Sequence, residues 1–250
     1  MSLLESILVL VAGFAAGTIN AVIGSGTLIT FPVLLAVGYP PIVANVSNNL
    51  GLVPGAASAA LGYREQLRGS GQRLLRFAPA TVAGAVIGSA LLLSLPENSF
   101  KRIVPVLIVI SLVLIVFQPR ISRWATERRA ATKPHGGPVL RSGIFGTGIY
   151  GGYFGAGQGI LLFGLLAISL PDDLRELNAV RAVLAGIANA VAAVIFVFAA
   201  DVAYLPVILI AVGSTAGGLF GAGIGKRLPD PVLRGVIVVV GIAAILKLVL

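Results

Sequence analysis

The sequence predicts an all-α polytopic membrane protein with two inverted-topology repeats of about four to five helices each. The prediction rests on composition, on a repeated glycine phrase and on the placement of basic residues. Of the 250 residues, 57% are hydrophobic and only 11% are charged, and the mean hydropathy is +1.02. A soluble domain of this size needs far more polar surface. Several apolar stretches reach the roughly 20 residues that cross a hydrocarbon core.

Apolar stretches between short polar segments give the expected helices in chain order. The first, Leu3–Val37, is too long for a single crossing at about 1.5 Å per residue, and Gly24 and Gly26 interrupt it. The second half opens on a similar stretch, Ser142–Leu170, with the same kind of interruption. The other expected helices are Ile42–Leu61, Leu74–Leu95, Ile103–Phe117, Ala179–Ala200, Val202–Gly225 and Val232–Leu250.

The interruptions belong to a repeated phrase. Residues 20–27 are echoed by residues 150–158, so that Gly24 aligns with Gly155 and Gly26 with Gly157. A later block, Gly84-x3-Gly88 followed by Leu-Pro-Glu, recurs as Gly217-x3-Gly221 followed by Leu-Pro-Asp. The common order of these blocks favours duplication over chance. We therefore expect a first membrane repeat at 1–118, a basic cytoplasmic linker at 119–141 and a second, inverted membrane repeat at 142–250.

Basic residues predict how the two repeats face the membrane. Arg64, Arg68, Arg73 and Arg76 make the second loop of the first half cytoplasmic, as the long basic linker is. In the second half the equivalent loop holds only Asp201, and the next loop carries the basic residues Lys226, Arg227 and Arg234. The charge bias has changed sides, which predicts an in-plane pseudo-two-fold axis with both termini outside. Each interrupted segment either crosses twice or dips in and returns, which gives eight to ten membrane helices.

Several function classes are disfavoured by what the sequence lacks. The net charge is +9, but no nucleic-acid-binding motif accompanies it, so we expect no nucleic-acid partner. There is no cysteine, and the only histidine, His135, lies in a polar loop, so we expect neither a metal site nor a cofactor. No carboxylate falls clearly inside a membrane segment, which argues against a proton relay and against an embedded hydrolase. We expect a protein that is not an enzyme.

The first half carries a family pattern. It consists of Gly13-x3-Gly17-x2-Asn20-x3-Gly24-x-Gly26, then Phe31-Pro32, Gly38-Tyr-Pro-Pro, Ser47-Asn-Asn and Pro54-Gly55. Over nearly its full length the chain resembles the TauE/SafE sulfite exporter family of membrane permeases. That resemblance implies transport of a small sulfur-containing anion, such as sulfite or an organosulfonate, across a bacterial inner membrane.

A Gly-x-Gly break inside a membrane helix frees backbone groups, which are tolerated only inside protein or beside water. The helix N-termini that it creates attract anions. The expected substrate-binding residues are Asn20, Gly24, Ser25, Gly26, Thr27, Asn45, Asn48, Asn49, Tyr153, Gly155, Gly157, Gln158 and Arg181.

Structural alternatives remain for several of these residues. The glycines can serve helix packing, as we favour for the two Gly-x3-Gly pairs. Asn45, Asn48 and Asn49 can cap the start of their helix. Arg181 can extend to the cytoplasmic interface, which is the account that we favour for it. Tyrosines 150 and 153 can be ordinary interface residues.

The predicted function is a secondary transporter that moves a small anion by alternating access. A channel-like anion pore and a non-transporting membrane assembly subunit are the alternatives. The expected partners are the anionic substrate and the lipid bilayer, and the oligomeric state is undetermined. The second phrase has Gly151 where the first has Asn20, so we expect specificity to lie in that difference between the halves.

Overall fold

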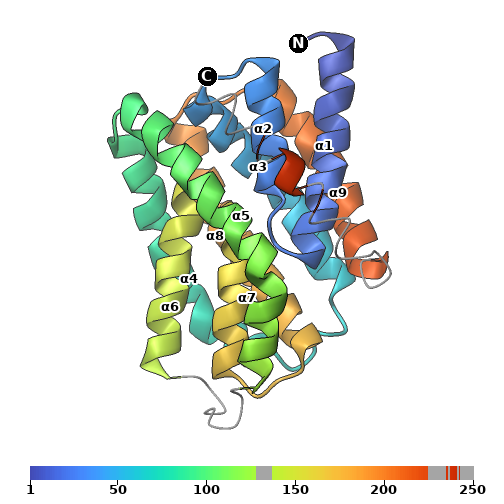
Figure 1. Ribbon diagram of the computed structural model, residues 1–250, viewed down its shortest axis with the longest axis vertical. Coiled ribbons are helices and arrows are strands. Elements are labelled where there is room, and N and C mark those ends of the chain that lie inside the picture. The colour runs from blue at the N-terminus through green and yellow to red at the C-terminus, as the bar shows by residue number, and fades with distance from the viewer. Residues whose placement is uncertain (128–136, 225–234, 236, 241, 243–250) are drawn as a thin grey trace.

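The computed structural model describes residues 1–127, 137–224, 235, 237–240 and 242. Within those residues all regular secondary structure is helical (Figure 1). Five of the described helices are long and apolar enough to cross a membrane. They cover residues 3–22, 71–94, 98–120, 174–199 and 204–223. The prediction of an all-α polytopic membrane protein is confirmed.

Both predicted interruptions are present. Helix α1 (Leu3–Val22) ends shortly before α2 (Thr27–Val37), and α6 (Pro138–Tyr153) ends shortly before α7 (Gln158–Ser169). Gly24 and Gly155 adopt φ values of 86° and 77°, which L side chains rarely adopt. These glycines let the chain leave one helix and start the next within four residues. We call residues 23–26 break 1 and residues 154–157 break 2.

Each interrupted segment folds back on itself as a hairpin. The start of α1 and the end of α2 line one small pocket, formed by Met1, Glu5 and residues 37–39. In the second hairpin, Gly143 near the start of α6 lies against Leu165 near the end of α7. Helix α2 has 11 residues and α7 has 12, or about 16–18 Å at 1.5 Å per residue. The returning arm of each hairpin is therefore about half as long as a membrane crossing.

The remaining described helices are longer. They are α3 (Pro41–Gly62), α4 (Gly71–Ser94), α5 (Glu97–Glu127), α8 (Leu174–Ala199) and α9 (Tyr204–Ile224). Helix α5 continues past its expected end at Phe117, and α6 already starts at Pro138, so much of the expected linker 119–141 is helical. Residues 128–136 and most of the expected helix Val232–Leu250 lie outside the described residues, as do Lys226, Arg227 and Arg234.

The two hairpins open towards opposite ends of the molecule. In Figure 1 the first hairpin opens at the upper end, where the N-terminus lies, and the second opens at the lower end. The connection between α3 and α4, with exposed Arg64 and Arg68, also lies at the lower end. Arg73 joins Asp172 in an ion pair of 2.7 Å, which ties the start of α4 to the chain that follows α7. The pseudo-two-fold relation between the halves and the sidedness of the termini stay predictions.

Small residues let helices from different halves pack closely. Helix α1 lies along α9, where a Cβ at Gly17 would be 2.3 Å from the Ser214 carbonyl oxygen. Helix α6 lies along α4, where a Cβ at Gly84 would be 2.3 Å from the Phe145 carbonyl oxygen. Gly88, Gly217 and Gly221 face neighbouring backbone in the same way. The packing role that we favoured for the Gly-x3-Gly pairs is confirmed.

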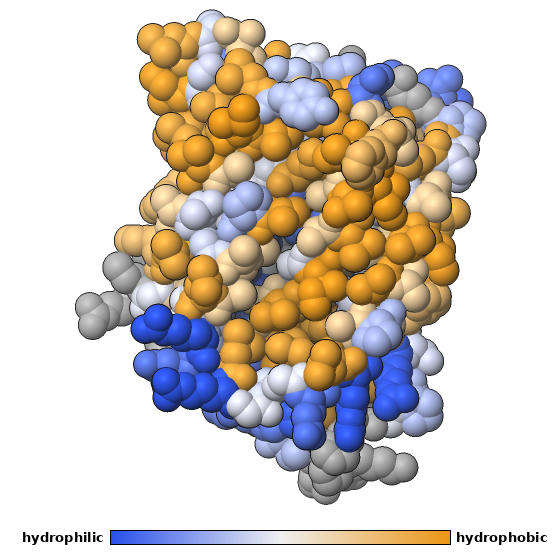
Figure 2. Space-filling view, turned by 180° about the vertical axis from the view of Figure 1, so that it is seen from behind, coloured by the Kyte–Doolittle hydropathy of each residue, from blue (hydrophilic) through white to orange (hydrophobic). Residues whose placement is uncertain are grey.

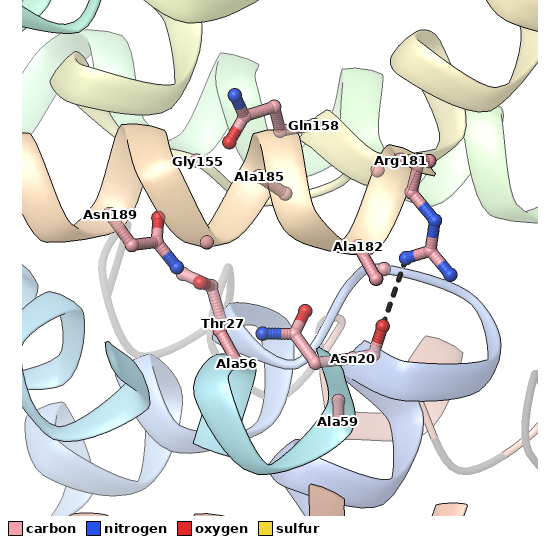
Figure 3. Close-up of a pocket in the computed structure, with 13 residues that line it drawn as sticks. Asn20, Thr27, Ala56, Ala59, Gly155, Gln158, Arg181, Ala182, Ala185 and Asn189 are labelled. Carbon is pink, nitrogen blue, oxygen red and sulfur yellow. Dashed lines mark hydrogen bonds between the residues drawn. The ribbon is translucent and has the colours of Figure 1, made fainter. Parts of the chain in front are cut away.

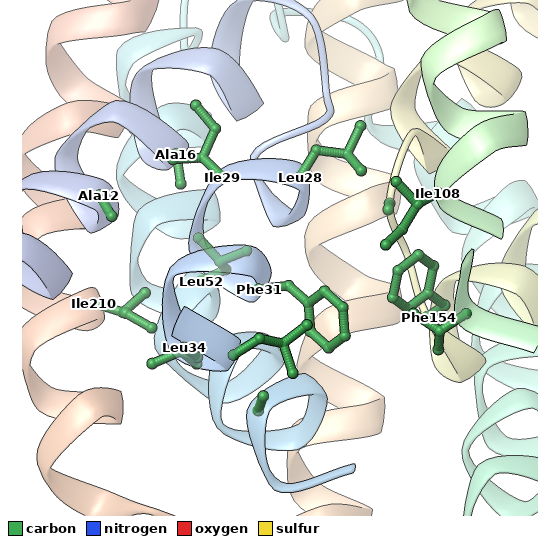
Figure 4. Packing of buried hydrophobic residues seen from close by; sticks show 14 of the residues in the cluster. Ala12, Ala16, Leu28, Ile29, Phe31, Leu34, Leu52, Ile108, Phe154 and Ile210 are labelled. Carbon is green, nitrogen blue, oxygen red and sulfur yellow. The ribbon is translucent and has the colours of Figure 1, made fainter. Parts of the chain in front are cut away.

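The core joins the two halves. Phe31 of α2 packs edge to face on Phe154 of break 2, with ring centroids 5.3 Å apart, and Leu28 and Ile108 lie beside them (Figure 4). On the outside, apolar side chains form a broad band above a strongly hydrophilic lower end, and the upper end is mixed (Figure 2). Such a band is the surface that a hydrocarbon core requires.

Candidate functional site

The tips of the two hairpins meet inside the bundle. The backbone N–H of Gly159, at the start of α7, donates to the carbonyl oxygen of Gly24 in break 1 at 3.2 Å. A Cβ at Gly24 would lie 2.7 Å from the Gly159 Cα, and a Cβ at Gly159 would lie 2.6 Å from the Gly24 Cα. Only glycine at both positions allows this contact, which places the two breaks side by side.

Break 1 is capped by a buried cation. Arg181 of α8 is 1% exposed. Its Nη1 donates to the Asn20 carbonyl at 2.9 Å, and its Nη2 donates to the Ala21 carbonyl at 2.8 Å and to the Val22 carbonyl at 3.5 Å. These carbonyls end α1 and have no partner further along that helix. A cation at a helix C-terminus is also stabilised by the helix dipole, by up to about 2 kcal/mol where it is partly buried.

Two further side chains hold Arg181 in place. Its Nη2 also donates to the Asn178 side-chain oxygen, one turn earlier on α8. The Asn178 amide donates to the Tyr63 hydroxyl at 3.2 Å, and that hydroxyl donates to the Ala21 carbonyl at 3.0 Å. The Arg181 Nε atom is buried without a hydrogen-bond partner among the described residues. Four acceptors therefore surround the two Nη atoms, and Nε is the guanidinium nitrogen that has no acceptor.

Break 2 is capped by neutral groups only. The Asn45 amide of α3 donates to the carbonyl of Tyr153, the last residue of α6, at 3.1 Å. The Ala156 carbonyl receives the Ser111 hydroxyl at 2.8 Å and the Tyr150 hydroxyl. The two breaks thus have similar backbones, but a guanidinium satisfies the first and amide and hydroxyl groups satisfy the second.

A polar side chain closes each hairpin near its break, from the first arm in one hairpin and from the second arm in the other. In the first hairpin the Asn20 side-chain oxygen of α1 accepts the Gly26 N–H at 3.0 Å. In the second, the Gln158 amide of α7 donates back to the Thr147 carbonyl of α6 at 3.0 Å. A Cβ at Gly151 would lie 2.3 Å from the Gln158 Nε2. Gly151 therefore makes the room that Gln158 fills.

A pocket lies between the hairpin tips and helices α3 and α8 (Figure 3). About 420 Å³ in this region is not filled by protein atoms, and part of that space is open to solvent. Asn189 and Asn20 extend into it from opposite sides, with Arg181 beyond Ala182 (Figure 3). Its lining residues are Asn20, Gly24, Thr27, Ala56, Ala59, Gly155, Gln158, Gly159, Arg181, Ala182, Ala185, Gly186 and Asn189.

Six of the residues predicted to bind substrate line this pocket: Asn20, Gly24, Thr27, Gly155, Gln158 and Arg181. The other seven lie outside its lining, namely Ser25, Gly26, Asn45, Asn48, Asn49, Tyr153 and Gly157.

Apart from Arg181, the predicted substrate-binding residues did not include the α8 side of the pocket. Asn189, the small residues Ala182, Ala185 and Gly186, and Arg181 recur every three or four positions, the period of one helix face. The sequence does contain a signal for this side of the pocket: Asn189 is a polar residue on a helix face made of small residues.

Two structural alternatives are wrong. Arg181 does not extend to an interface, because α8 carries it into the centre against the end of α1. The asparagines do not cap α3, which starts at Pro41 and has no side-chain cap. Instead Asn48 lies against α2, where it accepts from the Thr30 hydroxyl and donates to the Thr27 hydroxyl at 3.4 Å. The inward orientation predicted for them is confirmed, since all three are at most 7% exposed.

The pocket combines one positive charge with neutral polar groups. No carboxylate or histidine is among its lining residues, and the described residues contain no cluster of histidine, cysteine or acidic residues that could hold a metal ion. Such a site favours an anion and offers no general acid or base. Short, broken helices that meet around a polar pocket inside an apolar bundle are typical of membrane transporters.

Comparison with known proteins gives the same class and defines the family. The family model described as Sulfite exporter TauE/SafE matches residues 9–248, so the chain belongs to that family. A "Probable membrane transporter protein" of Haemophilus influenzae is 28% identical over 95% of this chain and 91% of its own length. The "Probable membrane transporter protein YfcA" of Escherichia coli K12 is 25% identical over 93% of this chain and 85% of its own length. No solved structure matches the chain.

These findings show a multi-pass membrane transporter, and the names of the family and of its members indicate transport rather than catalysis. Its substrate is a small molecule, and its surroundings are membrane lipid.

Proposed function

We propose that this protein is a permease that moves a small anion, sulfite or an organosulfonate, across the bacterial inner membrane by alternating access. The observation that carries the proposal is the buried guanidinium of Arg181 in a pocket without carboxylates. A buried charge costs several kcal/mol when it has no counter-charge. An anion that enters the pocket supplies that counter-charge.

The neutral groups around the pocket suit the oxygens of a sulfonate or sulfite group. Asn20, Thr27, Gln158 and Asn189 are amides and a hydroxyl, and they can donate without adding charge. The side chain of Asn189 makes no hydrogen bond with the described residues, so it is free to bind a ligand. We place the substrate between Arg181 and these groups, at the point where the hairpin tips touch.

Alternating access is the mechanism that this arrangement favours. The hairpins open towards opposite ends (Figure 1). Residues at both tips line one pocket. Movement of one half against the other would expose the pocket to one side at a time, as in transporters built from inverted repeats. The inverted relation of the halves, the outer position of the N-terminus and the cytoplasmic position of the linker form part of this proposal.

The test is flux through the purified protein in liposomes. Sulfite and methanesulfonate should enter protein-containing vesicles with saturable rates. The Arg181→Met protein should give no flux above empty vesicles, while Arg175→Met, a change at an exposed arginine on the same helix, should transport normally. Conductance without saturation would favour the channel-like pore instead. No flux from folded, reconstituted wild-type protein would favour the assembly subunit.

A further inference from the structure

The pocket has a simple charge inventory, which limits the charge of its ligand. Arg181 is the only ionisable side chain among the lining residues. Six carboxylates whose side chains the structure describes are at least partly exposed, and none of them lines the pocket. They are Glu5, Glu65, Asp172, Asp173, Glu176 and Asp201. The side chains that line the pocket therefore contribute a single positive charge.

Part of that positive charge is already balanced. The two Nη atoms of Arg181 point at the carbonyls that end α1, and a helix C-terminus carries about half a negative charge. The opposing positive ends, the starts of α2 and α7 beside Thr27 and Gln158, are part of the same pocket. These helix ends act as partial charges and add no full charge. The site as a whole stays close to a charge of plus one.

Arg181 keeps one nitrogen that its structural contacts do not use. The Nε–H group is buried and has no partner among the described residues. A buried donor without a partner costs about 1–3 kcal/mol, which a ligand oxygen would recover. The two Nη atoms keep their four acceptors when an oxygen binds at Nε. Binding at Nε therefore does not remove the α1 cap.

We infer that the pocket selects anions by charge, binding a singly charged sulfonate or hydrogensulfite and excluding a dianion such as sulfate. The inference rests on the proposed function and adds the charge of the substrate to it. A monoanion bound beside Arg181 leaves the buried site neutral. A dianion leaves one uncompensated negative charge away from water, and such burial is costly.

Binding to the purified wild-type protein tests the inference. Methanesulfonate and sulfate carry similar tetrahedral sulfur groups but differ by one charge. Titration calorimetry should give methanesulfonate at least a tenfold lower Kd than sulfate, at equal ionic strength, which is about 1.4 kcal/mol. A sulfite series should show weaker binding of total sulfite as the pH rises and the dianion replaces the monoanion.

The outcomes separate the inference from the proposed function. Binding of neither anion contradicts the proposed function. Equal or tighter binding of sulfate leaves anion binding intact and overturns charge selection, as does sulfite binding that strengthens at higher pH.

Asn189→Lys adds a second cation to the pocket without touching Arg181. It should move the preference towards sulfate by tenfold or more, and an unchanged ratio in folded protein would count against the inference. Gln158→Lys gives the same test from α7. The wild-type comparison holds whether or not either variant folds.

Discussion

The two helix breaks have similar backbone conformations, but the side chains that cap them differ in charge. In each, a residue from the third helix of one half reaches the end of the first helix of the other half. Arg181 of α8 binds the last carbonyls of α1, and Asn45 of α3 binds the last carbonyl of α6. The partner is a cation at break 1 and a neutral amide at break 2. Only one of the two similar breaks therefore carries a positive charge, and it is there that we propose the anion binds.

This difference shows how two similar hairpins can carry a site that is not symmetric. Both hairpins need their freed backbone groups satisfied, because such groups are costly away from water. Neutral amides and hydroxyls are enough for that, as break 2 demonstrates. The guanidinium at break 1 goes beyond structural need, since it adds a buried charge that no described carboxylate pairs with.

The largest expected effect comes from separating the breaks. Gly24→Ala forces a Cβ to 2.2 Å from Arg181 Nη1 and 2.7 Å from the Gly159 Cα, so the tips must move apart and the Arg181 cap must weaken. We expect a loss of unfolding free energy on the order of 3–5 kcal/mol, the cost of breaking a buried charged contact.

Gly69→Ala is the matched control for Gly24→Ala. Gly69 has the same φ of 86°, but a Cβ there meets nothing within 4 Å. Both changes strain the backbone, and only the first separates the tips. Thermal unfolding in detergent should show the larger loss for Gly24→Ala, and equal losses would mean that the contact between the breaks contributes nothing.

A second prediction tests whether charge distinguishes the breaks. Asn45→Leu leaves the Tyr153 carbonyl without its donor and should cost about 1–3 kcal/mol. The protein should nevertheless keep the rise in melting temperature that methanesulfonate gives the wild type. Arg181→Met should cost a similar amount of stability and lose that rise, because binding to the native state is what stabilises it.

Arg175→Met should behave as the wild type in both respects. If Asn45→Leu abolished the ligand-induced rise and Arg181→Met retained it, the assignment of the anion to break 1 would be wrong.

The sequence predicted the breaks because glycine is the residue that a sharp interruption requires, and Gly24 and Gly155 do adopt positive φ. The role of Arg181 was not predictable in the same way. Its chain neighbours Arg175 and Glu176 indicate a helix end near water, and only the packing of α8 on α1 places it in the centre. Asn189 was not among the predicted site residues, because its place in the site depends on a pocket that four separate segments form.

The third prediction concerns the hairpin bridges. Gly151→Ala places a Cβ against the Gln158 side chain and should destabilise the protein by about 1–3 kcal/mol. Gln158→Ala removes the bridge to Thr147 and makes room for that Cβ. The double variant should therefore lose less than the sum of the single losses, by about 0.5–3 kcal/mol in a double-mutant cycle. Additive losses would mean that Gly151 does not make room for Gln158.

The smallest effect is expected far from the tips. The ion pair between Arg73 and Asp172 ties α4 to the open end of the second hairpin, and both side chains are partly exposed, at 20% and 17%. Asp172→Asn should lower the unfolding free energy by no more than about 1 kcal/mol, less at high salt, because exposed ion pairs are screened. Exposed Glu65→Gln controls for the loss of a carboxylate at the same end.

If Asp172→Asn also removed the ligand-induced rise in melting temperature, anion binding would depend on how the second hairpin is anchored as well as on its tip. The difference between the two breaks would then extend along the whole hairpin, whereas an unchanged rise confines it to the contact of Arg181 with α1.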